Sequence, residues 1–237
     1  NTVMLHATYT TVDKTTTTSG NLTGTSANEY IVGGDGDNVI SGGNGNDIIY
    51  GGDGNDTLSA SSGSDMFYGG AGNDTITGSS GLDRISGGSG NDTMSAGADT
   101  FVDVFVWSLG DQGAAGAPAV DTINNFVTTA AGSSHSGGDV LDLRDLLQGE
   151  HVGANNAAGN LANYLHFEVS GGNTTIHISH TGGFNADSHA VSAGFTSSAE
   201  TQKIVLNGVD LQSVYSGATT DQQIITQLLN NNKLITD

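Results

Sequence analysis

Carboxylates recur every nine residues in the first half of the chain, and each closes a glycine-rich stretch. They are Asp47, Asp56, Asp65, Asp74, Asp83 and Asp92, with Glu29 and Asn38 at the two preceding places. Glycine at fixed places predicts turns that need positive φ or a very close approach of two backbone segments. A carboxylate beside the bare carbonyls of such turns offers only oxygen ligands. Oxygen ligands favour a hard cation, calcium before any transition metal.

These acids belong to a nine-residue unit that is repeated eight times without insertion, from Gly24 to Ser95. The units begin at Gly24, Gly33, Gly42, Gly51, Ala60, Gly69, Gly78 and Gly87. Such a period predicts a solenoid. The eighth position is always apolar (Ile31, Ile40, Ile49, Leu58, Phe67, Ile76, Ile85, Met94), so each unit supplies a short strand and one inward side chain. A disordered linker, which the composition alone favours, lacks this phase.

The repeats resemble the calcium-binding nonapeptides GGxGxDxUx of the RTX (repeats-in-toxin) family, best in the units GGDGNDTLS, GGAGNDTIT and GGSGNDTMS. The resemblance implies a mostly β fold, a parallel β-roll in which two units make one coil and calcium lies between turns two units apart. By the family's pattern, the earlier turn supplies the carbonyls of its second and fourth residues and its sixth side chain. The later turn supplies the carbonyls of its first and third residues and its own carboxylate.

Carried onto this sequence, the pattern gives two rows of sites, because alternate units lie on opposite edges of such a roll. On edge 1 the three sets are Gly34, Gly36 and Asn38 with Gly51, Asp53 and Asp56; Gly52, Gly54 and Asp56 with Gly69, Ala71 and Asp74; and Gly70, Gly72 and Asp74 with Gly87, Ser89 and Asp92. On edge 2 they are Gly43, Gly45 and Asp47 with Ala60, Ser62 and Asp65; and Ser61, Gly63 and Asp65 with Gly78, Ser80 and Asp83.

The two edges are not equal in sequence. Edge 1 keeps its glycines, whereas Thr25, Ser61 and Ser79 replace the second glycine on edge 2. We therefore predict about three well-formed calcium sites on edge 1 and up to three weaker ones on edge 2. Asn38 removes a charge from the first edge 1 site, which should bind less tightly than its neighbours.

The composition suits a calcium-dependent protein. The chain of 237 residues has 25 Asp and Glu against 5 Lys and Arg, a formal net charge of -20. Nucleic acid is therefore not expected as a partner. Without calcium the carboxylates repel one another and the thin core cannot stabilise the coil, so folding and metal binding should be one event. The chain has no cysteine, and metal would take the role that disulfides fill in other secreted domains.

The repeats are expected to lie between other segments. Residues 1–23 are interpreted as the tail of a preceding domain and a linker, and residues 96–137 as capping strands and a loop. Trp107 is expected to plug the core of the cap. Asp99, Asp103, Asp121 and Asp139 either complete another calcium site or are solvated acids at turns and helix starts.

Residues 138–237 resemble the carboxy-terminal type I secretion target domain of large bacterial RTX adhesins. The resemblance rests on GDVLDLRDLL, NLANYLHFEVSGGNTTIHIS, KIVLNGVDL and DQQIITQLLNNNKLITD. It implies an uncleaved carboxy-terminal signal that an inner-membrane ABC exporter reads. Periodicity predicts a strand running into a helix over residues 139–147, a hairpin through Ser170 to Asn173, a strand over 203–209 and a helix over 220–229. The last helix could also simply pack on the cap.

No catalytic constellation is present in the sequence. It has neither the HExxH of zinc proteases nor the GxSxG of lipases. His177 and His180 fall on opposite faces of the expected strand, which argues against joint chelation. His180 and His189 could form a metal pair across a loop, the alternative being solvated loop histidines.

The preferred interpretation is a non-catalytic module of a secreted or cell-surface bacterial adhesin whose adhesive target is carried elsewhere in the parent. Residues 1–20 lack the features of a signal peptide, and no membrane-inserted segment is expected. The alternative is the tail of a secreted protease, lipase or epimerase. An ice-binding solenoid is disfavoured because the seventh position is irregular: Tyr30, Val39, Ile48, Thr57, Met66, Thr75, Arg84, Thr93.

Overall fold

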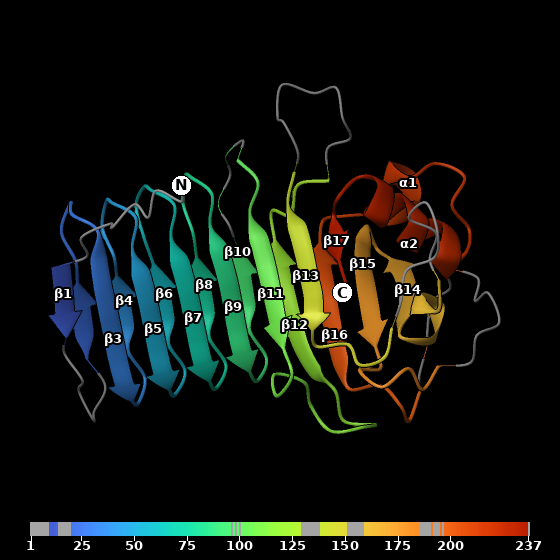
Figure 1. Ribbon diagram of the computed structural model, residues 1–237, viewed down its shortest axis with the longest axis horizontal. Helices are drawn as coiled ribbons and strands as arrows, with labels where there is room; N and C mark the ends of the chain where they lie inside the picture. Colours follow the sequence, from blue (N-terminus) through green and yellow to red (C-terminus); the bar gives the residue numbers. More distant parts are fainter. Residues whose placement is uncertain are drawn as a thin grey trace, which may run out of the picture.

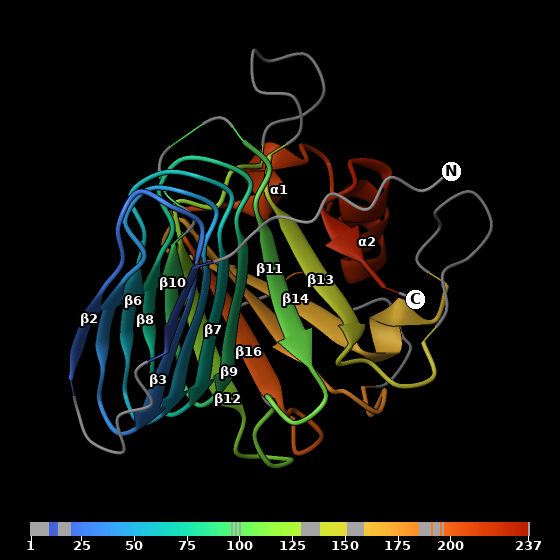
Figure 2. The same cartoon turned by 60° about the vertical axis from the view of Figure 1, so that its left-hand side comes forward.

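Two long β-sheets face each other along the molecule (Figure 1; Figure 2). The computed structural model describes residues 10–13, 20–95, 97, 99, 101–128, 138–150, 159–184, 191, 195 and 197–236. In the repeat region the chain crosses from one sheet to the other at every glycine-rich turn, so successive strands alternate between the sheets. The fold is the expected parallel β-roll followed by a β-rich cap with short helices.

The two sheets have different strand lengths. Sheet A runs in the order β1 (Thr10–Asp13), β3 (Glu29–Asp35), β5 (Ile48–Asp53), β7 (Met66–Ala71), β9 (Arg84–Ser89), β11 (Val104–Ser108), β13 (Val140–Asp145), β17 (Leu234–Ile235). Sheet B runs in the order β14 (Leu165–Ser170), β15 (Asn173–Ile178), β16 (Gln202–Asn207), β12 (Ala119–Asn124), β10 (Thr93–Ser95), β8 (Thr75–Thr77), β6 (Thr57–Ser59), β4 (Val39–Ser41), β2 (Asn21–Thr23). Roll strands in sheet A are longer because they include the first residues of the edge 1 turns.

The eighth residue of every unit forms the core of the roll, as the repeat predicts. Ile31 lies beside Ile49 and Phe67 in sheet A, and Ile40 lies beside Leu58 in sheet B. All eight of these side chains are at most 1% exposed. The layers are two units apart and in parallel register, which brings turns of the same edge into contact.

The outward faces of the sheets differ because alternate units supply them. In sheet B the seventh position is Val39 followed by Thr57, Thr75 and Thr93, whereas in sheet A it is Tyr30, Ile48, Met66 and Arg84. At the ninth position in sheet A, Tyr50 stacks on Tyr68 at 4.5 Å between ring centroids. The seventh position is irregular along the chain because alternate units place it in different sheets. Within sheet B alone it is regular from Thr57 to Thr93.

The cap extends both sheets and adds a hairpin and helices. The hairpin β14–β15 turns at Gly171 and Gly172, as expected, and β16 joins it to β12. Two α-helices, α1 (Leu211–Val214) and α2 (Asp221–Asn230), and the 3-10 helix η2 (Leu161–Asn163) complete it. Thr220 and Gln223 form a capping box, and the apolar face of α2 is buried, so the final helix is confirmed. No helix in the described ranges is long and apolar enough to cross a bilayer.

Two expectations about the flanking segments differ from the structure. The helix expected after Asp142 is absent: β13 continues to Asp145 and a turn follows, because β13 is held between β11 and β17. In the segment interpreted as a linker, β1 pairs with β3 and β2 pairs with β4, so the roll begins before Gly24.

Candidate calcium sites between stacked turns

From Asp47 to Asp92, each turn ends on a carboxylate that accepts a hydrogen bond from the layer before it. On edge 1, the Oδ1 atoms of Asp56, Asp74 and Asp92 accept hydrogen bonds at 2.7 to 2.8 Å from the backbone N–H groups of Asn38, Asp56 and Asp74. On edge 2, those of Asp47, Asp65 and Asp83 accept from Glu29, Asp47 and Asp65 at 2.7 to 2.9 Å. The sixth-position side chains therefore form two columns of buried carboxylates along the roll.

The second oxygen of most of these carboxylates has no hydrogen-bond partner. Among the described residues, the Oδ2 atoms of five are buried and unpartnered: Asp47, Asp56, Asp65, Asp74 and Asp92. A buried charged oxygen without a donor is costly, and its regular recurrence in two columns indicates a common missing counter-charge. A divalent cation supplies that charge without needing a donor proton.

Backbone carbonyls converge on the same oxygens. A Cβ added to Gly51 would collide with Asp56 Oδ2 and lie 2.6 Å from the carbonyl oxygen of Gly69. At Gly69 the equivalent point lies against Asp74 Oδ2 and the carbonyl oxygen of Gly87. The carboxylate of one turn and the first carbonyl of the next thus face a single small space, as the carried-over ligand sets require.

The remaining candidate carbonyls also lie between the turns. Carbonyl oxygens of the second and fourth positions point at the next turn, where a Cβ on Gly70 or Gly72 would strike those of Gly52 or Gly54. Positive φ at Gly52, Gly54, Gly70 and Gly72 permits this approach. Third-position carbonyls accept one hydrogen bond from the earlier turn, as in Gly54 N–H to Ala71 at 2.7 Å, which leaves one lone pair.

The edge 2 candidates are stacked in the same way but with fewer unpartnered oxygens. The carbonyl oxygen of Gly45 points at Gly63, and the N–H groups of Gly45 and Gly63 donate to the carbonyls of Ser62 and Ser80 at 2.9 Å. Ser61 N–H donates to the carbonyl of Gly43 at 2.7 Å. Asp83 Oδ2 accepts the N–H of Ser79 at 3.2 Å, unlike its edge 1 equivalents.

The first turn of each edge partly satisfies itself. On edge 1, the Asn38 side-chain amide donates to the carbonyl oxygen of Gly36, which is one of the expected ligands. On edge 2, the carboxylate of Glu29 accepts hydrogen bonds from the hydroxyl and the N–H of Thr25. Asn38 and Glu29, the two departures from Asp at the sixth position, are thus partly satisfied by hydrogen bonds within their own turns, which reduces the need for a cation there.

Burial makes these carboxylates poor anions without a cation. It raises the pKa of Asp65, Asp74 and Asp92 to about 7, against the opposing effect of their backbone hydrogen bonds, and neighbouring carboxylates raise it further. Burial likewise raises the pKa of Asp103 to about 8. A bound divalent ion would restore the anionic form, so the columns fit calcium in charge as well as in ligand type.

The edge 1 column ends at Asp121 in the cap. Asp121 Oδ1 accepts the N–H of Asp92 at 2.8 Å, as in the repeats. Its Oδ2, however, accepts hydrogen bonds from Trp107 Nε1 and Gln202 Nε2, both at 2.7 Å. Trp107 is buried in the core as expected, but its polar contact was not anticipated from the sequence.

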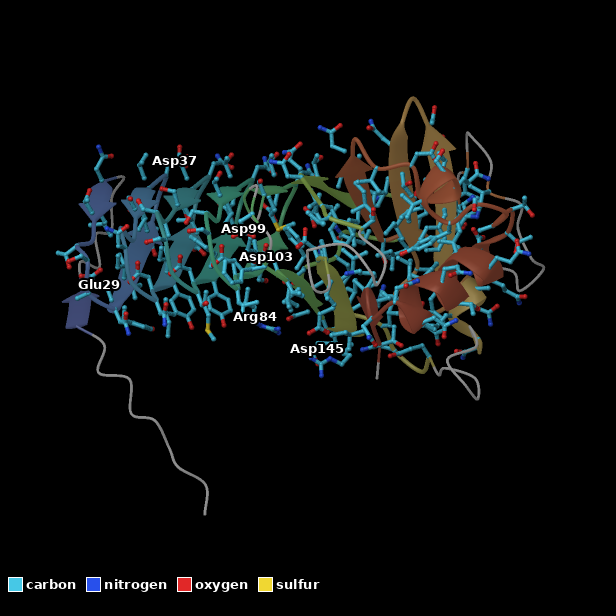
Figure 3. All side chains as sticks on the ribbon, turned by 90° about the horizontal axis from the view of Figure 1, so that it is seen from above. Glu29, Asp37, Arg84, Asp99, Asp103 and Asp145 are labelled. Carbon is cyan, nitrogen blue, oxygen red and sulfur yellow. The ribbon has the colours of Figure 1, made fainter. Side chains whose placement is uncertain are left out.

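The edge 2 column ends at Asp139. Its two oxygens accept the N–H groups of Asp103 at 3.2 Å and Val127 at 2.8 Å. Burial raises its pKa to about 6, while the buried Lys233 ammonium acts in the opposite direction. Asp99 lies next to Asp103 where the repeats give way to the cap (Figure 3). Asp99, Asp103 and Asp139 therefore belong to edge 2 and Asp121 to edge 1, and the four do not form one site.

The cap contains a buried histidine pair that the sequence did not reveal. His166 and His177 are cross-strand partners on β14 and β15, with ring centroids 5.6 Å apart. His166 Nδ1 lies 2.7 Å from Asp221 Oδ2, and His177 Nδ1 lies 2.5 Å from Glu200 Oε1. In the described part of the chain no three His, Cys, Asp or Glu side chains are grouped to hold a metal, and His189 lies outside the described residues.

Comparison with known proteins identifies the repeats. Residues 23–58 and 59–94 each match the family of the RTX calcium-binding nonapeptide repeat (four copies). Residues 23–94 are therefore a run of RTX calcium-binding repeats, and they fold as a β-roll. No curated protein sequence is similar to the chain.

Two solved structures from Azotobacter vinelandii are similar to it, both described as subunits of a mannuronan C5-epimerase. The solution structure of AlgE6R2 is 18% identical, covers 91% of both chains and has a TM-score of 0.40. That of AlgE6R3 is 19% identical, covers 85% of this chain and 83% of its own, and has a TM-score of 0.31.

Proposed function

We propose that the chain is the calcium-dependent folding and export module of a secreted bacterial RTX adhesin and has no catalytic activity of its own. The observation that carries the proposal is the regular series of buried, unpartnered Oδ2 atoms in the RTX turns. Several calcium ions, about three strongly held on edge 1 and up to three less strongly on edge 2, would neutralise them. This makes the roll a metal-dependent fold, since its core is one small side chain per unit.

The same dependence gives a mechanism for export. In low-calcium cytoplasm the carboxylate columns repel and the chain remains unfolded, in the state that a narrow exporter requires. Outside the cell, sites of the extracellular affinity class, about 10⁻⁴ to 10⁻³ M, fill and fold the roll. Binding of ions to the folded state alone then opposes backward movement.

The position of the carboxy-terminal segment supports this order of events. β16 pairs with β12 and β17 pairs with β13, so the segment proposed as the export signal is part of both sheets once the protein has folded. Leu228 and the other apolar residues of α2 are buried. An ABC exporter partner would therefore have to read the segment before the roll forms.

A calcium titration of the full chain, followed by circular dichroism, tests the folding part of the proposal. We expect little β-structure in chelator and a cooperative gain of it in the millimolar calcium range, with a much smaller response to magnesium. Asp56→Asn together with Asp74→Asn should raise the calcium requirement, whereas Asp37→Asn, on an exposed carboxylate, should not. A fold that persists in chelator above about pH 8, where the carboxylates are ionised, would overturn the proposal.

The export part needs a separate experiment. Secretion through a reconstituted type I exporter should fail when residues 201–237 are removed and should persist when the edge 1 carboxylates are substituted. A secreted enzyme carrying the same tail would behave identically, and the sequence upstream of Asn1 in the parent distinguishes the two.

A further inference from the structure

One carboxylate oxygen in the edge 1 column faces the cap instead of another repeat. Asp56 Oδ2 and Asp74 Oδ2 each face the first carbonyl of the following turn, Gly69 and Gly87 respectively. Asp92 Oδ2 is the equivalent oxygen one layer further along, and it is also buried and unpartnered. Because the layers repeat regularly, Asp92 Oδ2 should face the space beyond the last repeat. The residues that match the RTX family end at residue 94, so they do not form the far side of this space.

The loop between β11 and β12, on the same edge as the edge 1 turns, carries a carboxylate (Figure 1). Asp111 lies in the loop between β11 and β12, and its Oδ2 accepts the N–H of Ser108 at 2.6 Å, which orients the side chain. Asp111 is near enough to raise the pKa of both Asp92 and Asp121, although burial is the larger cause in each. In Figure 1 this loop lies at the lower edge, next in line after the edge 1 turns.

The next carboxylate of the edge 1 column, Asp121, is satisfied by side-chain donors and does not need a cation. Continuing the pairing of Phe105 with Ile85, Trp107 stands at the level of Gly87. Its indole N–H donates to Asp121 Oδ2, so Asp121 is already satisfied. Gln202 donates to the same oxygen, and its own Oε1 is buried and unpartnered. Asp92 Oδ2 therefore remains without a donor while Asp121 is satisfied, and the Asp111 carboxylate is near enough to act on both.

We propose that the roll carries one further calcium site beyond its last repeat, where Asp92 Oδ2, the carbonyls of Gly88 and Gly90 and the carboxylate of Asp111 hold the ion. The proposal rests on the calcium-dependent folding proposed above. Because the N–H groups of Gly113 and Gly116 donate to the carbonyls of Thr201 and Glu200 at 2.8 and 2.9 Å, the same loop is bonded to the segment directly before β16. The ion would therefore join the last repeat to the carboxy-terminal segment of the cap.

With this additional site, the three strong sites of edge 1 lie one layer closer to the cap than the repeat sequence predicts. The site that contains Asn38 is weakened by its own amide, and the cap site adds one at the opposite end of the column. Edge 1 then keeps three sites with an unpartnered carboxylate oxygen, belonging to Asp56, Asp74 and Asp92. On edge 2, the last carboxylate of the column, Asp139, accepts two backbone N–H groups.

The test compares Asp111→Asn with Asp37→Asn in the full chain. Asp37 is exposed on an edge 1 turn and accepts a hydrogen bond from Asn55, an asparagine in the same turn position, so it is a matched loss of one charge. Native mass spectrometry in calcium should count one ion fewer in Asp111→Asn and no change in Asp37→Asn. Equal counts in both variants overturn the proposal.

Terbium provides an independent readout near the site. Trp107 is the one tryptophan of the chain, so terbium emission sensitised through tryptophan reports ions close to the cap. We expect this emission to fall in Asp111→Asn while emission sensitised through the tyrosines of the roll is retained. If Asp111→Asn fails to fold, a crystal structure of the calcium-loaded wild type decides: an ion bonded to Asp92 Oδ2 supports the site, and water there overturns it.

Failure of this inference is distinguishable from failure of the proposed function. If wild-type chain shows no calcium-dependent folding, the proposed function is wrong. If it folds with calcium but Asp111→Asn and Asp37→Asn bind equal numbers of ions, only the additional site is wrong.

Discussion

Trp107 Nε1 donates a hydrogen bond of 2.7 Å to Asp121 Oδ2, the oxygen whose equivalents in the repeats have no partner. The indole N–H therefore gives Asp121 Oδ2 the partner that a cation would give to the equivalent oxygens of the repeats. Gln202 supplies a second donor to the same oxygen. Asp121 is thus the point where stabilisation by metal gives way to stabilisation by side chains and a larger apolar core.

Substitution of Trp107 should destabilise the calcium-loaded protein. Trp107→Phe removes one donor from a buried carboxylate and leaves a small cavity, which together should cost about 2 to 4 kcal/mol in the free energy of unfolding. Thermal unfolding in saturating calcium measures this. The cost should shrink in an Asp121→Asn background, where the carboxylate is already neutral. Equal costs in the two backgrounds would show that the indole acts through packing alone.

Restoring an acid at the start of the edge 1 column should strengthen calcium binding. Asn38→Asp replaces an amide that donates to the carbonyl of Gly36 with a carboxylate that cannot donate. We expect the calcium concentration at half-folding to fall, because an added ligand charge raises affinity. In chelator the same variant should be less stable than wild type, since it adds another like charge to the column. Asn55→Asp adds the same charge at an exposed position and should do neither.

The two edges should respond unequally to the loss of a carboxylate. Asp74→Asn removes an unpartnered oxygen that faces Gly87, in the edge with intact glycines. Asp83→Asn removes a carboxylate whose Oδ2 already accepts a hydrogen bond from the N–H of Ser79. We expect about a tenfold rise in the calcium requirement for Asp74→Asn and a smaller one for Asp83→Asn. Isothermal titration of both variants checks this, and equal losses would contradict the predicted inequality of the edges.

The calcium-free fold should be favoured by acid. Burial raises the folded-state pKa of Asp65, Asp74 and Asp92 to about 7 and of Asp103 to about 8, above the ordinary value of 3.8. The folded state then binds more protons than the unfolded state, so its stability is greatest below about pH 4 and is lost as the pH rises toward 8. Circular dichroism in chelator across this range measures it.

Calcium should reverse this pH dependence, because the ion replaces protons on the same oxygens. Adding calcium near pH 7 in weak buffer should release protons, which a pH electrode detects directly. No proton release together with a pH-independent calcium-free state would show that these carboxylates are ionised in the absence of metal.

Local repetition was sufficient to predict the roll, its core and the turns that hold the candidate ligands. The period determines which residues stack, so the sequence alone places Ile31, Ile49 and Phe67 in one column. The helix expected after Asp142 was wrong because a local pattern does not show that β17, which lies ninety residues later, pairs with that strand. The Trp107 contact with Asp121 and the histidine pair were missed for a related reason. The hairpin expected through Ser170 to Asn173 does imply that His166 faces His177, but their partners Asp221 and Glu200, like Asp121 for Trp107, lie at separations that no spacing rule specifies.

The contact between His166 and Asp221 leads to a prediction about the carboxy-terminal helix. Asp221 is the first residue of α2 and is fully buried. Its carboxylate lies 2.7 Å from His166 Nδ1 and accepts the N–H of Phe167 at 2.9 Å. These bonds attach the helix to β14 at its amino end, whereas its apolar face attaches it along its length. Removal of the carboxylate leaves two buried groups of β14 without their acceptor, which should cost about 3 kcal/mol.

Asp221→Ala should therefore loosen α2 without affecting the calcium-bound repeats. Hydrogen exchange in saturating calcium should show lost protection over residues 221–235 and unchanged protection in β5 to β9. Asp210→Ala is the matched control, because Asp210 caps the short helix α1 through Ser213 N–H at 2.9 Å and makes no contact with β14 that the described residues show. It should cost only about 1 kcal/mol and leave α2 protected. If Asp221→Ala keeps full protection in α2, apolar packing alone attaches the helix, and the His166 contact is incidental to its folded position.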